Sequence, residues 1–155
     1  MIATLRLLTL ILIASAASAA DTVPRQLRDF PETSLTITRT DGRDSFRVWI
    51  ADTPVRQQQG LMFVRELPAD RGMLFPQRQP RVMSMWMKNT YIPLSVAFLD
   101  AEGTIINIAD MQPHSEQSHC ATRPALYALE MEKGWFAQRG IKAGLKLGGL
   151  STAPR

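Results

Sequence analysis

Residues 34–50 read SLTITRTDGRDSFRVWI and predict a β-hairpin. Apolar and polar residues alternate in Leu35-Thr36-Ile37 and again in Phe46-Arg47-Val48, so each segment has one apolar face, as a half-buried strand does. Between them, Asp41-Gly42 is a common hairpin-turn pair. This stretch therefore indicates that the folded domain starts with antiparallel β-structure near residue 34.

The rest of the chain continues with short strands between turn residues. Thr53-Pro54 and Gly60 have the residue types of a helix start and a helix stop, so one short helix is expected between them. Another helical turn is expected at residues 135–138. Strands are expected at Met73–Phe75, Arg81–Met87, Leu94–Leu99, Thr104–Met111 and Tyr127–Met131. The pattern predicts a mainly β fold over residues 34–150: a single antiparallel β-sandwich, jelly-roll-like or partly closed barrel domain with one or two short helices.

The N-terminus resembles a secretory signal peptide. A single basic residue, Arg6, precedes the apolar run 7–14, and small residues follow up to Ala20. The apolar run is shorter than the roughly 20 residues that cross a bilayer. We predict cleavage after a signal peptide of residues 1–20, a flexible arm at 21–33, and an exported protein, periplasmic or extracellular, with no transmembrane segment after cleavage.

Charge and cysteine content limit the partners. The chain has 18 basic and 14 acidic residues, and the basic ones are dispersed rather than clustered. Nucleic acid is therefore not expected as a partner. Cys120 is the single cysteine, so no intramolecular disulfide is available. It is expected to be a partly buried small residue, with a reactive thiol or an intermolecular disulfide as alternatives. A monomer is expected.

The segment 82–90 carries the candidate site. Its apolar alternation ends in Trp86 and then in an amine, an amide and a hydroxyl, on Lys88, Asn89 and Thr90. With Glu130 from a later strand, these five residues form the predicted ligand-binding set, for a small molecule or an envelope protein. Two other interpretations stay open: Lys88 and Glu130 form a structural salt bridge beside ordinary turn residues, or they act as the acid–base pair of an envelope enzyme.

A copper(I) site is the other alternative. Thioethers suit this soft ion, and the strand alternation places three methionines on one face, near a later loop that has both histidines and the cysteine. The candidate ligands are Met83, Met85, Met87, His114, His119 and Cys120. Core packing by the methionines is the competing interpretation. The chain lacks the common catalytic signatures, such as Gly-x-Ser-x-Gly or His-Glu-x-x-His. Enzyme activity therefore stays open, without an assigned catalytic residue, and the cofactor is unknown.

An ordered set of motifs resembles the exported bacterial and archaeal family of domain of unknown function 192. The motifs are Gly60-Leu61-Met62, Gly72-Met73-Leu74-Phe75, Trp86-Met87-Lys88-Asn89-Thr90, Ile92-Pro93-Leu94, Gly103, Pro113, Leu129-Glu130 and Gly144. The resemblance covers about residues 34–147 and implies a compact β-rich domain, usually exported, with no established activity. Two positions depart from the family pattern: Ser95 stands where an aspartate is common, and Lys133-Gly134 stands where Ala-Gly is frequent.

Overall fold

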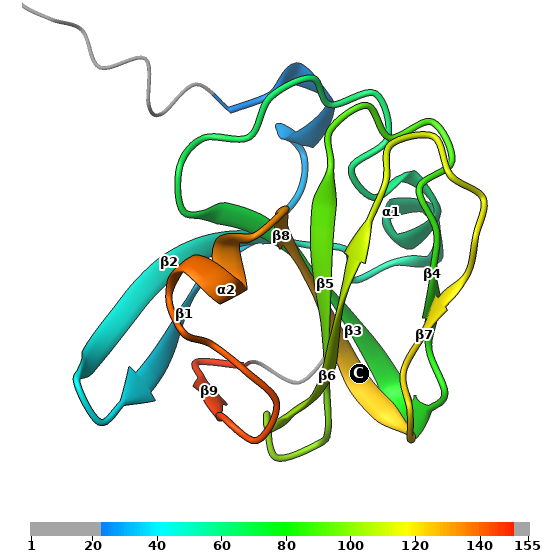
Figure 1. The fold of residues 1–155 in the computed structure, drawn as a ribbon. Helices are drawn as coiled ribbons and strands as arrows, with labels where there is room; N and C mark the ends of the chain where they lie inside the picture. The colour runs from blue at the N-terminus through cyan, green and yellow to red at the C-terminus, as the bar shows by residue number, and fades with distance from the viewer. Residues whose placement is uncertain (1–22, 151–155) are drawn as a thin grey trace, which may run out of the picture.

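The computed structural model describes residues 23–150, and the predicted signal peptide lies outside them. An open seven-stranded sheet forms the body of the domain (Figure 1), in the order β6-β5-β8-β3-β2-β1-β9. Its strands are β1 (Glu32–Arg39), β2 (Gly42–Ile50), β3 (Arg71–Arg81), β5 (Leu94–Leu99), β6 (Ile105–Met111), β8 (Ala125–Glu132) and β9 (Leu147–Gly148). A separate pair consists of β4 (Ser84–Met85) and β7 (His119–Cys120). The mainly β class is confirmed.

Three short helical elements accompany the strands: the 3-10 turn η2 (Arg25–Leu27), α1 (Pro54–Gln59) and α2 (Trp135–Gln138). The signals that predicted α1 act as expected. The Thr53 side chain accepts the N–H of Arg56, and Gly60 ends the helix at a φ of 48°. No helix within residues 23–150 is long and apolar enough to cross a bilayer.

The predicted hairpin is confirmed, with β1 and β2 antiparallel and Leu35 opposite Phe46. The next connection differs from the expected antiparallel pattern, because β2 and β3 run parallel. Parallel neighbours require a long crossover, and residues 51–70 supply it. This crossover contains α1 and is the segment that later forms one wall of the candidate site.

Two predicted strand boundaries are wrong. β3 continues through Pro76 to Arg81, because Pro76 needs no N–H partner on the side that faces α1, where its carbonyl accepts the Gln57 side chain at 2.8 Å. β4 contains only two residues, because its flanks make isolated bonds with a later loop instead of a ladder: Ala121 N–H to the Met83 carbonyl, and Met87 N–H to the Ser115 carbonyl.

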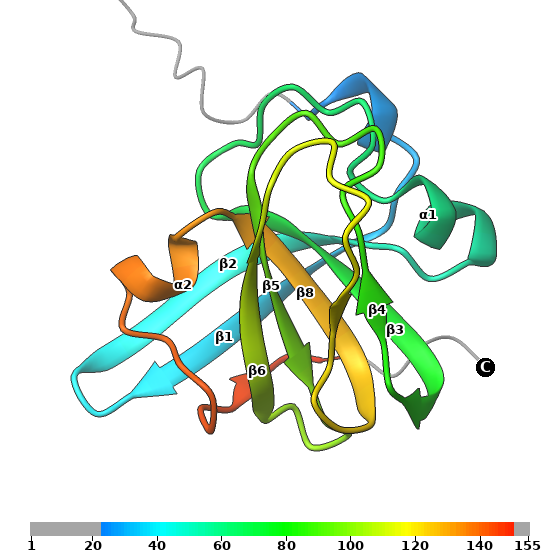
Figure 2. The same cartoon turned by 45° about the vertical axis from the view of Figure 1, so that its right-hand side comes forward.

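The sheet separates two apolar clusters. The first includes Trp49, Phe75, Met83, Met87 and Phe98, and the second includes Leu35, Phe46, Leu129, Trp135 and Phe136. Trp135 and Phe136 of α2 belong to the second cluster, and the two views show α2 on one side of the molecule and α1 with β4 and β7 on the other (Figures 1 and 2). Alternation along β8 assigns Ala128 to the first cluster and Leu129 and Met131 to the second. Glu130 therefore faces the first cluster.

Candidate functional site

A buried carboxyl group lies in the middle of the sheet. Glu130 is 4% exposed and sits on β8 opposite Met73 of β3 and Val96 of β5. Gly72 lets β3 approach this point, because a Cβ there would lie 2.2 Å from the Glu130 carbonyl oxygen. The central strands thus hold the Glu130 side chain in a fixed position on the first apolar cluster.

Burial determines the protonation of Glu130. Loss of solvent raises its pKa from 4.5 to about 8. Among residues 23–150, no side chain forms an ion pair with it, so no opposite charge offsets this desolvation. At neutral pH the group is mainly an uncharged acid, which can donate one hydrogen bond as well as accept others.

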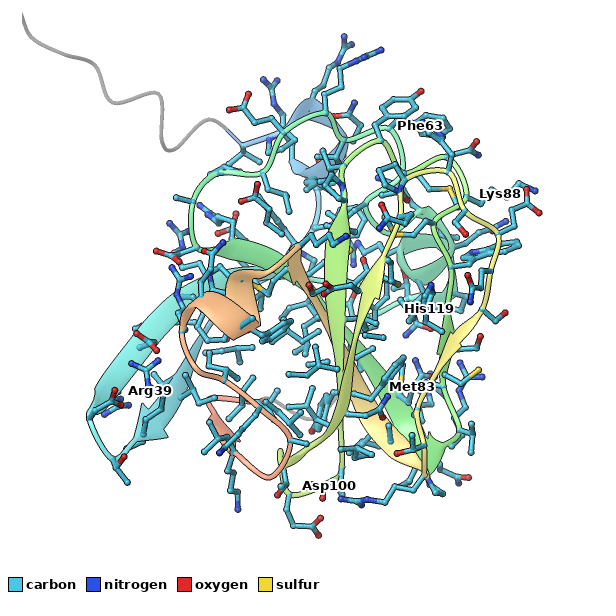
Figure 3. The ribbon with its side chains drawn as sticks, viewed as in Figure 1. Arg39, Phe63, Met83, Lys88, Asp100 and His119 are labelled. Atoms are coloured by element: carbon cyan, nitrogen blue, oxygen red, sulfur yellow. The ribbon has the colours of Figure 1, made fainter. Side chains whose placement is uncertain are left out.

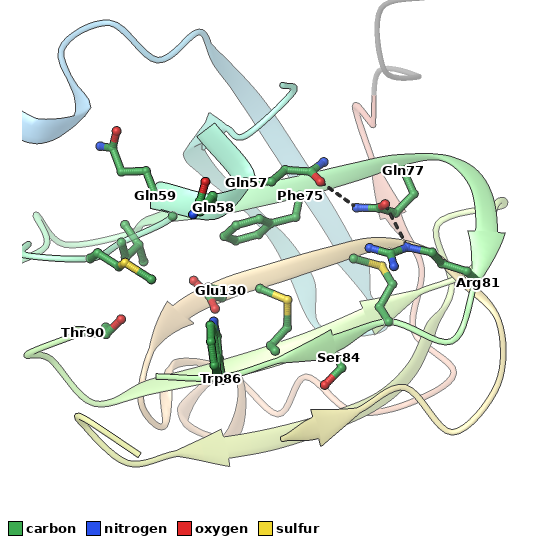
Figure 4. A pocket seen from close by; sticks show the side chains of 15 residues that line it. Gln57, Gln58, Gln59, Phe75, Gln77, Arg81, Ser84, Trp86, Thr90 and Glu130 are labelled. Carbon is green, nitrogen blue, oxygen red and sulfur yellow. Dashed lines mark hydrogen bonds between the residues drawn. The ribbon is translucent and has the colours of Figure 1, made fainter. Parts of the chain in front are cut away.

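Glu130 lines a cavity of about 140 Å³ between α1, β3 and β4 (Figure 4). This volume is close to that of a cavity known in another protein to admit benzene, so one ring or one side chain fits. The lining combines amides, thioethers, hydroxyls and two aromatic rings, contributed by Gln57, Gln58, Gln59, Gly60, Leu61, Met62, Phe75, Gln77, Arg81, Met83, Ser84, Met85, Trp86, Thr90 and Glu130.

A chain of hydrogen bonds fixes the polar rim of this cavity. Gln57 donates to the Pro76 carbonyl at 2.8 Å and accepts from the Gln77 side chain at 3.4 Å. Arg81 Nε then donates to Gln77 Oε1 at 3.0 Å, as the dashed lines of Figure 4 show. The guanidinium of Arg81 is therefore held at the rim. Gln58 is exposed on α1 and makes no side-chain hydrogen bond within residues 23–150.

The structure brings three of the five predicted ligand-binding residues together. Trp86, Thr90 and Glu130 line the cavity, whereas Lys88 and Asn89 do not. Lys88 extends over the outer part of the site, with Nζ 5.4 Å from the centre of the Trp86 ring. No Lys88–Glu130 ion pair forms, so the salt-bridge interpretation of this pair is wrong.

Asn89 and Thr90 shape the backbone beside the cavity. Asn89 has a φ of 56°, and its side chain lies 4.0 Å from the Met62 sulfur. Thr90 is buried and donates its hydroxyl to the Lys88 carbonyl at 3.3 Å. The sequence did not indicate three further lining residues, Gln58, Gln77 and Arg81, because their signal was weak: a glutamine run on a short helix and polar residues after a strand.

The six copper(I) candidates lie in different surroundings. Met83 and Met85 line the cavity, but Met87 is fully buried in the first apolar cluster. Neither histidine reaches the cavity lining: the His114 ring packs on Tyr91, and His119 is paired with Met85 across β4 and β7. Figure 3 shows Met83 and His119 on the side of the molecule where α1, β4 and β7 lie. Copper binding stays a prediction.

Cys120 is exposed on β7, so its expected partial burial is wrong. Its backbone carbonyl accepts the side chain of Asn107, which fixes β7 against β6. Within residues 23–150, no three His, Cys, Asp or Glu side chains form a metal-binding group. The structure therefore adds no further ligands to this thiol.

Two larger hollows are less suited to be a site. One, of about 350 Å³, contains Ser95 and Asp110. Ser95 is buried but fully used, because its hydroxyl donates to Asp110 at 2.6 Å and accepts the Gly134 N–H at 3.0 Å. The other, of about 450 Å³, lies along residues 76–81 and has no buried titratable side chain. The Glu130 cavity alone, among these three, contains a buried group without a structural partner.

Comparison with known families assigns the chain. The model of the family described as domain of unknown function 192, "Uncharacterized ACR", matches residues 36–149. The chain belongs to this family. The matched range contains the whole cavity, from Gln57 to Glu130. A comparison with curated proteins finds no significant match.

Two solved structures share the domain of unknown function 192 fold. One is a proposed transcription regulator from Sinorhizobium meliloti, 34% identical, with a TM-score of 0.75, covering 77% of this chain and 95% of that one. The other is a protein of unknown function from Novosphingobium aromaticivorans, 36% identical, with a TM-score of 0.75, covering 86% of this chain and 96% of that one. The similarity to these two structures supports the fold of this chain and does not establish an activity for it.

Proposed function

We propose that this protein is a small-ligand-binding module whose site is the cavity above Glu130. The observation that carries the proposal is the unpartnered carboxyl group, 4% exposed, in the lining of a cavity with an amide-rich rim. Trp86 and Thr90 contribute an aromatic ring and a hydroxyl to the lining. Gln58 and Arg81 complete the set from α1 and β3.

The energetic cost of Glu130 supports a binding role. A buried polar group that lacks a hydrogen bond costs roughly 1–3 kcal/mol, and the ionised form costs more. Among the described residues, Trp49 Nε1 is a fully buried side-chain atom without a hydrogen-bond partner, whereas the Ser95 hydroxyl is satisfied by Asp110 and Gly134. The Glu130 oxygens are not among the fully buried unsatisfied atoms, so they are open to the cavity, where a ligand can bond to them.

Binding explains the geometry better than catalysis does. The proposed acid–base partner Lys88 lies over Trp86 and outside the cavity lining. Arg81 is the other charged residue in that lining, and arginine stays protonated in proteins. Glu130 therefore has no second titratable group with which to share a proton in this cavity.

A blocked variant with a matched control tests the proposal. Gln58→Trp places a large ring at the rim of the cavity, and Val55→Trp places the same ring on the same helix at a position 74% exposed and outside the lining. The probes are single-ring compounds: glucose, galacturonate, benzamide and benzoate. We expect at least one probe to shift the backbone amide signals of residues 84–90, and Gln58→Trp alone to abolish the shift.

The outcome that overturns the proposal is equally specific. If none of the four probes moves these amide signals, the cavity is no ligand site for single rings. If Gln58→Trp and Val55→Trp respond identically to a bound probe, that probe binds elsewhere. Circular dichroism of both variants establishes that each has kept its fold.

We also propose that the protein is exported and acts outside the cytoplasm. The support is the apolar run 7–14 followed by small residues in the sequence. The intact mass of the protein from its native cell envelope tests this. A chain that starts at Ala20 or Asp21 is expected, and a chain that retains residues 1–20 would contradict export by cleavage.

A further inference from the structure

Three cations surround the cavity without carboxylate partners within residues 23–150: Arg65, Arg81 and Lys88. Each rests against an uncharged group. Arg65 lies 5.0 Å from the centre of the Tyr91 ring, Lys88 lies 5.4 Å from that of Trp86, and Arg81 donates to Gln77. These contacts fix the direction of each cation and leave its charge unneutralised.

Three exposed aromatic side chains lie beside the cavity. Trp86 lines it, and Phe63 and Tyr91 directly follow the lining residues Met62 and Thr90 in the chain. Figure 3 shows Phe63 and Lys88 at one end of the molecule and Arg39 at the other. Exposed apolar groups concentrated beside a cavity indicate a surface that contacts a partner or ligand.

Phe63, Tyr91 and His114 form a continuous aromatic surface, here called the aromatic platform. The ring centres of Phe63 and Tyr91 are 6.1 Å apart, and those of Tyr91 and His114 are 5.2 Å apart. Phe63 is 47% exposed and Tyr91 is 36% exposed. Such rings usually bury their area in a core, so the exposed platform offers preformed contact area to a ligand.

Backbone hydrogen bonds between three loops hold the platform together. Phe63, Asn89 and His114 have φ values of 64°, 56° and 61°, a region that bulky side chains rarely adopt. Phe63 N–H donates to the Asn89 carbonyl at 2.9 Å, and His114 N–H donates to the Thr90 carbonyl at 3.1 Å. These bonds join three loops, and strain is expected mainly at Phe63, because asparagine and histidine adopt this region more readily. Strain of this kind concentrates at functional sites.

The aromatic platform adjoins the cavity. Met62 and Thr90 line the cavity, and they directly precede Phe63 and Tyr91 in the chain. The Asn89 side chain contacts the Met62 sulfur between them. A ligand longer than one ring can therefore place one unit in the cavity and the next on the platform.

Building on the proposed function, we propose that the ligand is an acidic oligosaccharide, with one sugar ring in the cavity and the next on the aromatic platform. Its carboxylates would meet Arg81, Lys88 and Arg65, which have no other acidic partner within residues 23–150. The apolar faces of its rings would stack on Trp86 and Tyr91.

The hydrogen-bonding groups of the cavity favour a sugar over an aromatic acid. The side chains of Gln58 and Ser84 can both donate and accept, and the Thr90 hydroxyl, which donates to the Lys88 carbonyl, can still accept, so sugar hydroxyls suit all three. A flat aromatic body would leave them unpaired, which disfavours binding. Glu130 is compatible with an anion because burial raises its pKa to about 8, so it is mainly uncharged at neutral pH.

Titration calorimetry with matched probes tests the inference. Trigalacturonate is compared with its methyl ester, which keeps the rings and removes the charges, and with tripolyphosphate, which keeps charge and removes the rings. We expect trigalacturonate to bind at least tenfold more tightly than either. Arg81→Gln should weaken its binding about tenfold, whereas Arg43→Gln, an equal charge loss on the remote hairpin, should change it less than twofold.

Several outcomes would overturn this inference. They are binding of the methyl ester or of tripolyphosphate as tight as that of trigalacturonate, or an equal loss of trigalacturonate affinity in the Arg81→Gln and Arg43→Gln variants. If trigalacturonate fails while a single-ring probe still depends on Gln58, the ligand class is wrong and the cavity remains a binding site. If the single-ring probes fail as well, both proposals are wrong.

Discussion

The two ends of the molecule use their charges in different ways. At the β1–β2 end, basic side chains meet carboxylates: Arg39 pairs with Asp44 at 2.5 Å, and Arg71 pairs with Glu32 at 2.8 Å. At the cavity end, Arg65 and Lys88 meet aromatic rings and have no carboxylate partner within residues 23–150. The first arrangement completes a fold, and the second leaves charge available to a ligand.

Buried polar groups follow the same division. Arg71 is 5% exposed, contacts the Glu32 carboxylate and lies 4.8 Å from the centre of the Trp49 ring. Glu130 is equally buried, yet no cation neutralises it among the described residues. The difference shows that burial alone does not identify a functional group. The absence of a structural partner beside a cavity is the more informative feature.

The largest expected effect concerns Glu130 and pH. Its pKa is about 8 in the folded protein and 4.5 without burial. Between these pH values the unfolded chain releases a proton that the folded chain retains. The contribution of Glu130 to the free energy of unfolding is therefore fully present below pH 4.5 and decreases as pH rises toward 8. Relative to Glu130→Gln, wild type should lose on the order of 4 kcal/mol of unfolding free energy over this range.

Urea unfolding of wild type and Glu130→Gln at pH 4, 6 and 8 measures this difference. Titrations elsewhere in the chain are common to both proteins and cancel in the comparison. Arg81 is the other charged group lining the cavity and keeps its charge throughout. Parallel stability curves for the two proteins would show that Glu130 titrates normally and would remove the main support for the site.

A medium effect is expected at the opposite end. Glu32→Gln removes the carboxylate that accepts from buried Arg71 at 2.8 Å and from Arg47 at 2.5 Å. We expect a loss of about 2 kcal/mol, because a buried cation loses one of its partners, a carboxylate. Lys88→Gln is the matched control at the cavity end and should change stability by less than about 0.5 kcal/mol. Thermal unfolding measures both, and equal losses would contradict the division between the two ends.

The smallest expected effect tests the strain at Phe63. Phe63→Gly and Phe63→Ala both remove the ring, but only glycine adopts a φ of 64° without strain. The glycine variant should be about 1 kcal/mol more stable than the alanine variant in urea unfolding. Both should bind trigalacturonate more weakly than wild type. Equal stability of the two variants would show that the left-handed backbone at this position stores no strain.

Local sequence signals predicted the parts of the fold that depend on neighbours in the chain. The hairpin of β1 and β2, the caps of α1 and the bounds of β5 follow from alternation, from Thr53 and Gly60, and from turn residues. The parallel pairing of β2 and β3 was not predictable this way, because it depends on contacts between distant segments. The continuation of β3 past Pro76 depends in turn on where α1 lies.

The candidate site was also predictable only in part from local sequence signals. Trp86 and Thr90 were predicted because the apolar alternation of this segment ends there in polar groups, and Glu130 was predicted as a carboxylate from a later strand. Gln58 and Arg81 were not found, since polar residues on a helix or after a strand look like ordinary surface until the fold brings them to one rim. Lys88 was expected beside Glu130, but it packs on Trp86.

The parallel crossover also has a consequence for how the chain folds. The crossover at residues 51–70 can pack over the sheet only after β2 has paired with β3. Glu130 belongs to β8, which lies some fifty residues after β3 in the chain. Contacts between such distant segments form slowly, because loop closure precedes them. The cavity should therefore be completed late in folding. Recovery of ligand binding during refolding would then lag behind the formation of the β1–β2 hairpin.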